Sequence, residues 1–214
     1  MVDKSNEYGY VPSSPTQARG SNTGIFEVND VLDLLAAKQW SGDFGALELI
    51  QTQNYSTDVG SIDFTSINET EYDVHMMTIN NLKAPASVGR IGFQFYEAGV
   101  LETAGVYEWA YNYREATGSG NDIRDNTSAD ILPFQYQISS SSITNAVIYF
   151  HYLGQSDNLA YFIFQQIGDA SPVSAFQGGG TLPQSSVIDG IRVTNTGAVN
   201  FTDYNISLYG VAKS

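Results

Sequence analysis

The sequence predicts an all-β fold for residues 46–212, an antiparallel β-sandwich of jelly-roll type, preceded by an extended N-terminal arm and one short α-helix. Three observations predict this fold. Apolar and aromatic residues recur at every second position in short runs, which is the period of a half-buried strand. Gly, Asn, Ser and Asp separate these runs at a spacing typical of a sandwich. Hydrophobic residues make up 42% and aromatic residues 13% of the chain, which is enough to fill a core.

Residues 1–24 lack this pattern and form the expected arm. The turn-forming residues of this segment are Gly9, Pro12, Pro15, Gly20 and Gly24. Alone in water such a segment is expected to be extended. Tyr8, Tyr10 and Val11 are apolar residues that an isolated linker would not need. We therefore expect the arm to become ordered on a neighbouring protein, and a frayed terminus is the alternative.

Residues 25–45 hold the expected helix and a linker. Between residues 27 and 40, apolar side chains recur at three- and four-residue spacing, which predicts an amphipathic helix. Gly42 is expected to end this helix. Because so short a helix is marginal by itself, we expect it to pack on the β domain or on a partner.

The alternation in residues 46–212 predicts ten strands joined by turns and loops. The predicted strands are 47–54, 61–64, 72–82, 90–95, 106–114, 132–138, 146–153, 160–166, 187–193 and 205–211. The segments expected to be long exposed loops are 116–130, 139–142 and 177–181. Loops of this kind carry binding more often than strands do, because the scaffold holds them in place while their sequence is free.

Charge and composition exclude several partners. The formal net charge of −14 repels phosphate backbones, so we expect no nucleic-acid partner. No stretch clusters Lys and Arg, and no apolar run approaches about 18 residues, so we expect no membrane insertion. No secretory signal pattern is visible at the N-terminus. The chain has no cysteine, which excludes disulfides and thiolate sites.

Residues suited to catalysis or metal binding do not form a recognisable pattern. His75 and His151 lie in predicted strands, without metal-ligand spacing between them. No Gly-x-Ser-x-Gly motif is present, which makes a serine triad a weak alternative. Carboxylate pairs such as Glu97 and Glu102 could serve a hydrolase only across a cleft that sequence cannot show. The acidic segment 121–130 lacks the spacing of an EF-hand, so we expect a solvated turn there, and a calcium site in this loop is the alternative. We therefore expect no enzyme activity, no metal and no cofactor.

The best binding candidate is a run of aromatic residues on one face of the strand predicted at 106–114. These residues are Tyr107, Trp109, Tyr111 and Tyr113. Aromatic rings make subunit interfaces and also stack on sugars. The run is taken here as a candidate oligomer or ligand surface, and packing in the core between two sheets is the alternative.

Six short phrases of the sequence are distinctive. They are residues 22–31 (NTGIFEVNDV), 45–53 (GALELIQTQ), 59–67 (VGSIDFTSI), 72–75 (YDVH), 187–191 (VIDGI) and 206–210 (ISLYG). The last five resemble a domain of tailed-bacteriophage virion proteins, especially from phages of marine bacteria, and the first is similar to the segment that often precedes that domain. Residues 98–180 match no such phrase. The resemblance implies a virion structural protein with a jelly-roll-like fibre or decoration domain, and it supplies no catalytic residues.

From these observations we expect a non-enzymatic virion structural protein, assembled in the host cytoplasm, that displays residues 46–212 outward as a head decoration or fibre-like component. The residues expected to attach it to the particle are Tyr8, Tyr10, Val11, Ile25 and Phe26. The expected partners are other capsid or tail proteins and further copies of the chain, for which fibres suggest a trimer by analogy. The alternative is a module of a tail fibre or baseplate that binds a glycan receptor on the host.

Overall fold

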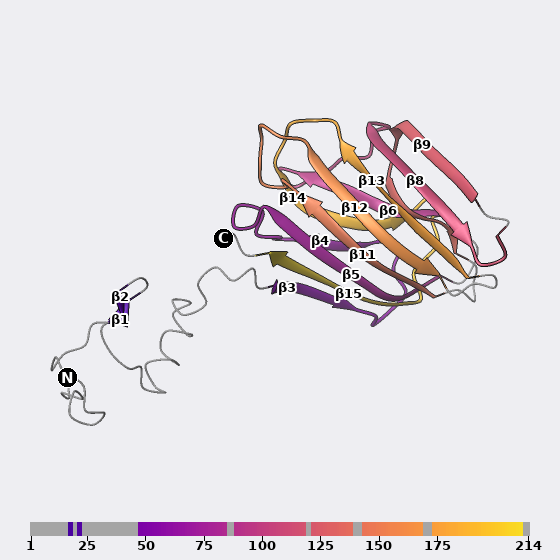
Figure 1. Ribbon diagram of the computed structural model, residues 1–214, viewed down its shortest axis with the longest axis horizontal. Coiled ribbons are helices and arrows are strands. Elements are labelled where there is room, and N and C mark those ends of the chain that lie inside the picture. Colours follow the sequence, from indigo (N-terminus) through magenta and orange to yellow (C-terminus); the bar gives the residue numbers. More distant parts are fainter. Residues whose placement is uncertain are drawn as a thin grey trace, which may run out of the picture. The chain divides into compact units, whose positions relative to one another are not determined.

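The computed structural model describes residues 17–18, 21–22, 47–84, 88–118, 121–138, 143–168 and 173–211 (Figure 1). The chain divides into two compact units, residues 1–45 with 214 and residues 46–213. In the first unit, β1 (Gln17–Ala18) pairs with β2 (Ser21–Asn22) in an antiparallel ladder. The helix expected at 27–40 and the expected attachment residues Tyr8, Tyr10, Val11, Ile25 and Phe26 lie outside the described residues.

The second unit is built from antiparallel strands, as the sequence predicts. Its larger sheet has eight strands in the order β3-β15-β5-β11-β12-β13-β8-β9. These strands are β3 (Leu47–Asn54), β15 (Asp203–Val211), β5 (Val74–Lys83), β11 (Thr144–His151), β12 (Ala160–Gly168), β13 (Ser174–Leu182), β8 (Tyr107–Glu115) and β9 (Asn121–Ala129).

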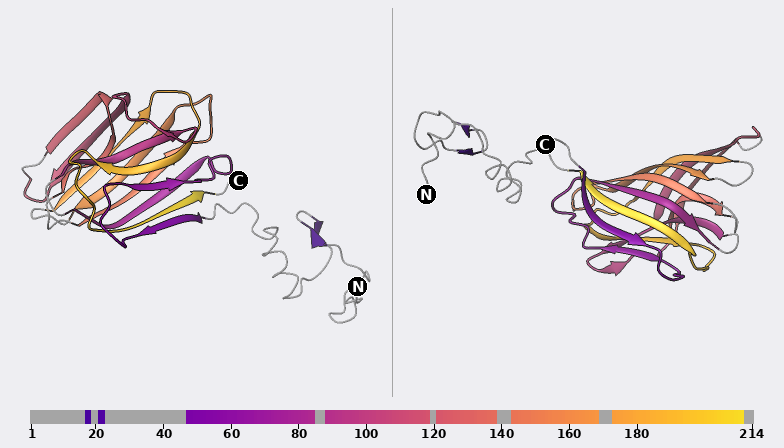
Figure 2. Two further views of the ribbon diagram at one scale, coloured as in Figure 1. Left: turned by 180° about the vertical axis from the view of Figure 1, so that it is seen from behind. Right: turned by 90° about the horizontal axis from the view of Figure 1, so that it is seen from below.

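The smaller sheet has the order β10-β6-β14-β4, and β7 also pairs with β6. Its strands are β10 (Leu132–Ile138), β6 (Val88–Glu97), β14 (Ile188–Asn195), β4 (Ile62–Thr65) and β7 (Val100–Leu101). Figures 1 and 2 show its strands lying across one face of the larger sheet, which makes the unit a β-sandwich. All of its neighbouring strands are antiparallel.

The core lies between the two sheets and is dominated by phenylalanine. Phe93 of the smaller sheet stacks on Phe134 at 4.8 Å between ring centroids. It also meets Phe150 and Phe162 of the larger sheet edge-on, at 5.1 and 5.8 Å. All four side chains are buried, and edge-on and stacked rings add to the free energy of burying their area.

Alternation along the central strands assigns one face of the larger sheet to the core and the other to solvent. In β12, buried and exposed residues alternate from end to end. Phe162 and Phe164 point into the core, whereas Tyr161 and Ile163 are 43% and 52% exposed on the opposite face. We call this solvent-exposed face the outer face of the larger sheet.

Each of the ten predicted strands overlaps an observed strand, but two of the expected loops are wrong. Residues 177–181 lie inside β13, and residues 121–129 of the expected loop 116–130 form β9. The third, 139–142, lies outside the described residues. The sequence pattern missed β13 because its three consecutive glycines carry no side chains to alternate, and it missed β9 because that edge strand is almost wholly polar.

Candidate functional site

Three of the four aromatic residues expected to form an oligomer or ligand surface are in the core. Tyr107, Trp109 and Tyr111 are 0%, 5% and 3% exposed. Tyr113 is half-buried and stacks on Phe176 at 5.1 Å. The expectation of an exposed aromatic surface is therefore corrected. These side chains of β8 face the smaller sheet. The structure therefore has the alternative arrangement, in which the aromatic run packs in the core.

The two histidines lie on the paired strands β5 and β11 but on opposite faces of the larger sheet. His75 is fully buried, and its Nε2–H donates to the carbonyl of Ile67 at 2.8 Å. Removal from water lowers the pKa of His75, and the hydrogen bond to Ile67 and the charge of Glu69 oppose this only in part. His151 is half-buried at the end of β11. A buried neutral imidazole already bonded to the backbone is a structural group.

Glu97 and Glu102, the carboxylates singled out in the sequence, each accept a hydrogen bond from the protein. Glu97 accepts a hydrogen bond from the Ser186 hydroxyl. Glu102 accepts one from the backbone N–H of Ala104 at 2.7 Å. Among the described residues, no group of three or more His, Cys, Asp or Glu is placed to hold a metal ion. In that same part of the chain, no helix is long and apolar enough to cross a membrane.

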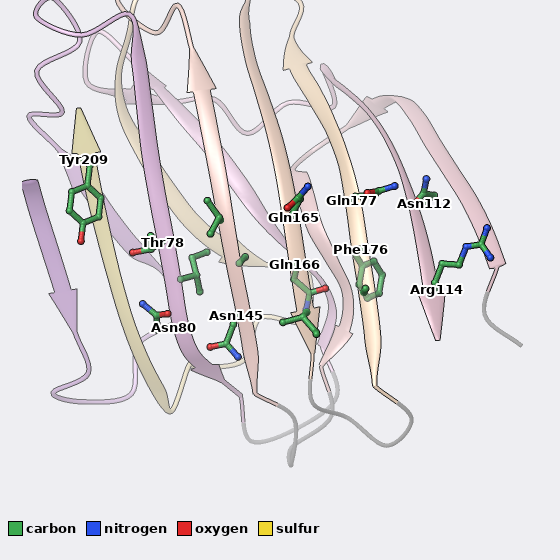
Figure 3. Close-up of a pocket in the computed structure, with 15 residues that line it drawn as sticks. Thr78, Asn80, Asn112, Arg114, Asn145, Gln165, Gln166, Phe176, Gln177 and Tyr209 are labelled. Atoms are coloured by element: carbon green, nitrogen blue, oxygen red, sulfur yellow. The ribbon is translucent and has the colours of Figure 1, made fainter. Parts of the chain in front are cut away.

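A hollow lies instead on the outer face of the larger sheet, above its central strands (Figure 3). Strand register brings Thr78, Val147, Gln165, Gln177 and Asn112 into one row across β5, β11, β12, β13 and β8. The hollow measures about 950 Å³. A second hollow of about 660 Å³ adjoins it and shares four of these residues, all except Thr78. The two are therefore parts of one depression, which we call the outer hollow.

Side-chain amides dominate its polar lining. The amide-bearing residues on the outer face are Asn80, Asn112, Asn145, Gln165 and Gln177. Asn145 accepts a hydrogen bond from the backbone N–H of Asn81 at 3.1 Å. Within the described part of the chain, the amides of the other four make no hydrogen bond to protein. Their donors and acceptors are directed to solvent and are available to a ligand.

Exposed apolar side chains lie among these amides. Val147, Tyr149 and Ile163 line the hollow and are 38%, 37% and 52% exposed. Tyr209 borders it at the β15 side. An aromatic or aliphatic side chain exposed beside amides offers apolar contact and hydrogen bonds within the same small area.

Gly178 of β13 lines the smaller part of the outer hollow and adds no side chain to it. Gly179 pairs with Ile163 on one side and with Ala110 on the other. A Cβ atom on Gly179 would lie 2.6 Å from the carbonyl oxygen of Phe162, and one on Gly178 would lie 2.4 Å from that of Ala110. Only glycine fits such close strand approach at these two positions.

The outer hollow differs in charge from the rest of the molecule. The chain has 23 acidic and 9 basic residues. None of the 15 residues that line the larger hollow is acidic, and one, Arg114, is basic. The outer hollow is therefore a nearly neutral, amide-rich region on a strongly acidic protein.

Sequence reasoning did not single out these residues. The five residues of the central row of the outer hollow, Thr78, Val147, Gln165, Gln177 and Asn112, belong to four predicted strands and one expected loop, and each is next in sequence to a buried aromatic or aliphatic residue. The available signal was that the outward positions of residues 106–114 and 160–166 carry Asn, Gln, Ala and Ile rather than charged residues only.

No known protein family matches this chain. No curated protein has a similar sequence.

Proposed function

We propose that this chain is a non-enzymatic structural protein of a tailed-phage virion, attached through residues 1–45 and displaying its β-sandwich outward. The observation that carries the proposal is where the phage-like phrases fall in the fold. Those at 45–53, 72–75 and 206–210 overlap β3, β5 and β15, which are consecutive neighbours in the larger sheet. Those at 59–67 and 187–191 overlap β4 and β14, which are neighbours in the smaller sheet.

The phrases thus come from distant parts of the sequence yet occupy one side of both sheets. Residues 98–180, which match no phrase, supply β7 to β13. Five of these strands, β11, β12, β13, β8 and β9, form the other side of the larger sheet without interruption. This division supports a common scaffold combined with a region particular to this protein, an arrangement suited to a displayed component of a particle.

Particle labelling tests the proposal. We expect an antibody against the β-sandwich to decorate intact purified phage particles in negative stain, and mass spectrometry to find the chain in them at a fixed copy number. A chain lacking residues 1–24 should fold with the same circular dichroism and fail to join the particle. The proposal is wrong if particles lack the protein, or if the shortened chain is incorporated normally.

The alternative function, binding of a host surface glycan, is favoured by one specific observation, the amide-lined outer hollow. It is compatible with a place on the virion, because a displayed structural protein can also carry a receptor site. The chemistry of that site is developed next.

A further inference from the structure

We propose that the outer hollow binds a neutral oligosaccharide lying across β5, β11, β12, β13 and β8. Its biological role as a receptor site rests on the proposed display of the β-sandwich on a particle, whereas the binding itself is a property of the isolated chain. Tyr107, Trp109, Tyr111 and Tyr113 are not among the lining residues and take no part in this binding.

Hydrogen-bonding chemistry selects a ligand rich in hydroxyl groups. A sugar hydroxyl donates one hydrogen bond and accepts others, and each carboxamide carries an NH₂ donor and a carbonyl acceptor. Asn112, Gln165 and Gln177 are consecutive across three paired strands, so their amides are spaced at the inter-strand distance of about 4.8 Å. Since these amides have no hydrogen bond to the described residues, a ligand replaces only water.

The apolar side chains complement the other surface of a sugar ring. Tyr149, Val147 and Ile163 expose carbon atoms beside the amides. The C–H faces of a pyranose can cover them while the ring's hydroxyls reach the amides on either side. A ligand that is either wholly apolar or wholly polar would leave one part of the lining unmatched.

The dimensions suit a short chain of sugars rather than one ring. From β5 to β8 the outer hollow crosses four inter-strand spaces, a span of roughly 19 Å. Its larger part alone measures about 950 Å³, at the upper end of the range for small-molecule sites. We therefore expect affinity to rise with oligosaccharide length until the span is filled.

Charge argues for an uncharged ligand. Among the described residues, the lining offers no carboxylate to balance a cationic ligand, and its one guanidinium there, Arg114, cannot balance a repeated anion. The net charge of −14 repels polyanions at longer range. A neutral oligosaccharide incurs neither penalty, so an uncharged ligand matches the electrostatics of this surface.

Calorimetric titration of the purified full chain tests the inference. The probes are neutral hexasaccharides of glucose, mannose, galactose and N-acetylglucosamine, with shorter members of each series, and an alginate hexasaccharide as the acidic probe. We expect at least one neutral hexasaccharide to bind, more weakly as it is shortened, and with an affinity insensitive to salt. Binding of alginate alone, lost at high salt or in Arg114→Gln, would overturn the proposal of a neutral ligand.

Matched variants locate the site. The double variant Gln165→Ala/Gln177→Ala should weaken binding about tenfold or more, because it removes two ligand hydrogen bonds. Asn112→Ala should also weaken binding, whereas Asn200→Ala, an exposed asparagine outside the lining, should not. All these variants should keep the wild-type Tm. Unchanged affinity in the first two variants, or no binding of any neutral probe, would refute the inference.

Two further results separate this inference from its competitors. If sedimentation shows a dimer that Gln165→Ala/Gln177→Ala dissociates, the occupant is a second copy and the glycan proposal is wrong. Particle labelling is independent of all these measurements. Failure of glycan binding with normal particle incorporation refutes the site alone, and glycan binding by a chain absent from particles refutes the proposed function alone.

Discussion

The hydroxyl of Tyr107 closes a gap in the smaller sheet. β6 pairs with β10 through Val88–Phe93 and with β7 through Tyr96–Glu97. Between them the N–H of Phe95 donates to the Tyr107 oxygen at 2.9 Å, and the Tyr107 hydroxyl donates to the carbonyl of Glu102 at 3.0 Å. A side chain from the larger sheet thus takes the place of a missing strand residue.

Tyr107→Phe removes both hydrogen bonds and keeps the ring, which meets the ring of Phe95 edge-on at 6.1 Å. Leaving a buried backbone N–H without a partner costs about 1–3 kcal/mol. The Glu102 carbonyl is only half-buried and can be rebonded by water. We therefore expect a loss of about 2 kcal/mol in the free energy of unfolding, out of a total of roughly 5–15 kcal/mol.

Urea unfolding, followed by circular dichroism, measures this loss. The slope of the unfolding free energy against urea concentration should be the same in Tyr107→Phe as in the wild type, which shows that the two unfold from the same native state. Tyr55→Phe is the matched control. Tyr55 is 43% exposed and its hydroxyl donates to Asp58 at 3.0 Å. This control should lose less than about 0.5 kcal/mol. Equal effects of the two substitutions would show that Tyr107 does not bridge the sheets.

Three other predictions concern single positions. Burial raises the pKa of Tyr107, and burial together with a hydrogen bond to the Glu48 carboxylate raises the pKa of Tyr72 to about 12. The unfolded chain therefore loses these protons first, and the free energy of unfolding should fall as the pH rises above 10. In Tyr72→Phe, denaturant unfolding at several pH values should show a less steep fall. The pKa of His75 is lowered by burial, so the unfolded chain takes up a proton at this histidine at a higher pH than the folded chain does. The free energy of unfolding should therefore fall as the pH drops below 6.5. If His75→Gln folds, its free energy of unfolding should depend less on pH in this range. Gly210→Ala places a Cβ atom 2.4 Å from the Tyr72 ring and should cost about 1–3 kcal/mol in denaturant unfolding, whereas Gly60→Ala, with its nearest contact at 3.6 Å, should cost little.

Much of the sandwich could be predicted from sequence because its strands are buried on one face. In β12, apolar residues that face the core alternate with residues that face solvent, and the strand is evident from that period alone. β13 follows a different rule. Gly178 to Gly180 are held as a strand by ladders to β12 and β8 on both sides, which is tertiary information.

The outer hollow could not be predicted for a related reason. Asn80, Asn112 and Gln165 are distant in sequence, and only strand order and register bring their strands together. The sequence shows the aromatic run at 107–113, but it does not show whether these side chains face the core or solvent. Period two divides a strand into two faces without saying which of them the second sheet covers, and here the aromatic face is the covered one.

The two faces of β8 therefore carry separable properties. Tyr111 points into the core and Asn112, the next residue, lines the outer hollow. A substitution on the inner face should change Tm and any ligand affinity together, because it disturbs the strand that carries the amides. A substitution on the outer face should change affinity alone, because an exposed amide without a protein partner contributes little to stability. If outer-face and inner-face variants instead lowered Tm to the same extent, the amides would be part of the folded core's hydrogen bonding, and the reason for assigning them to a ligand would disappear.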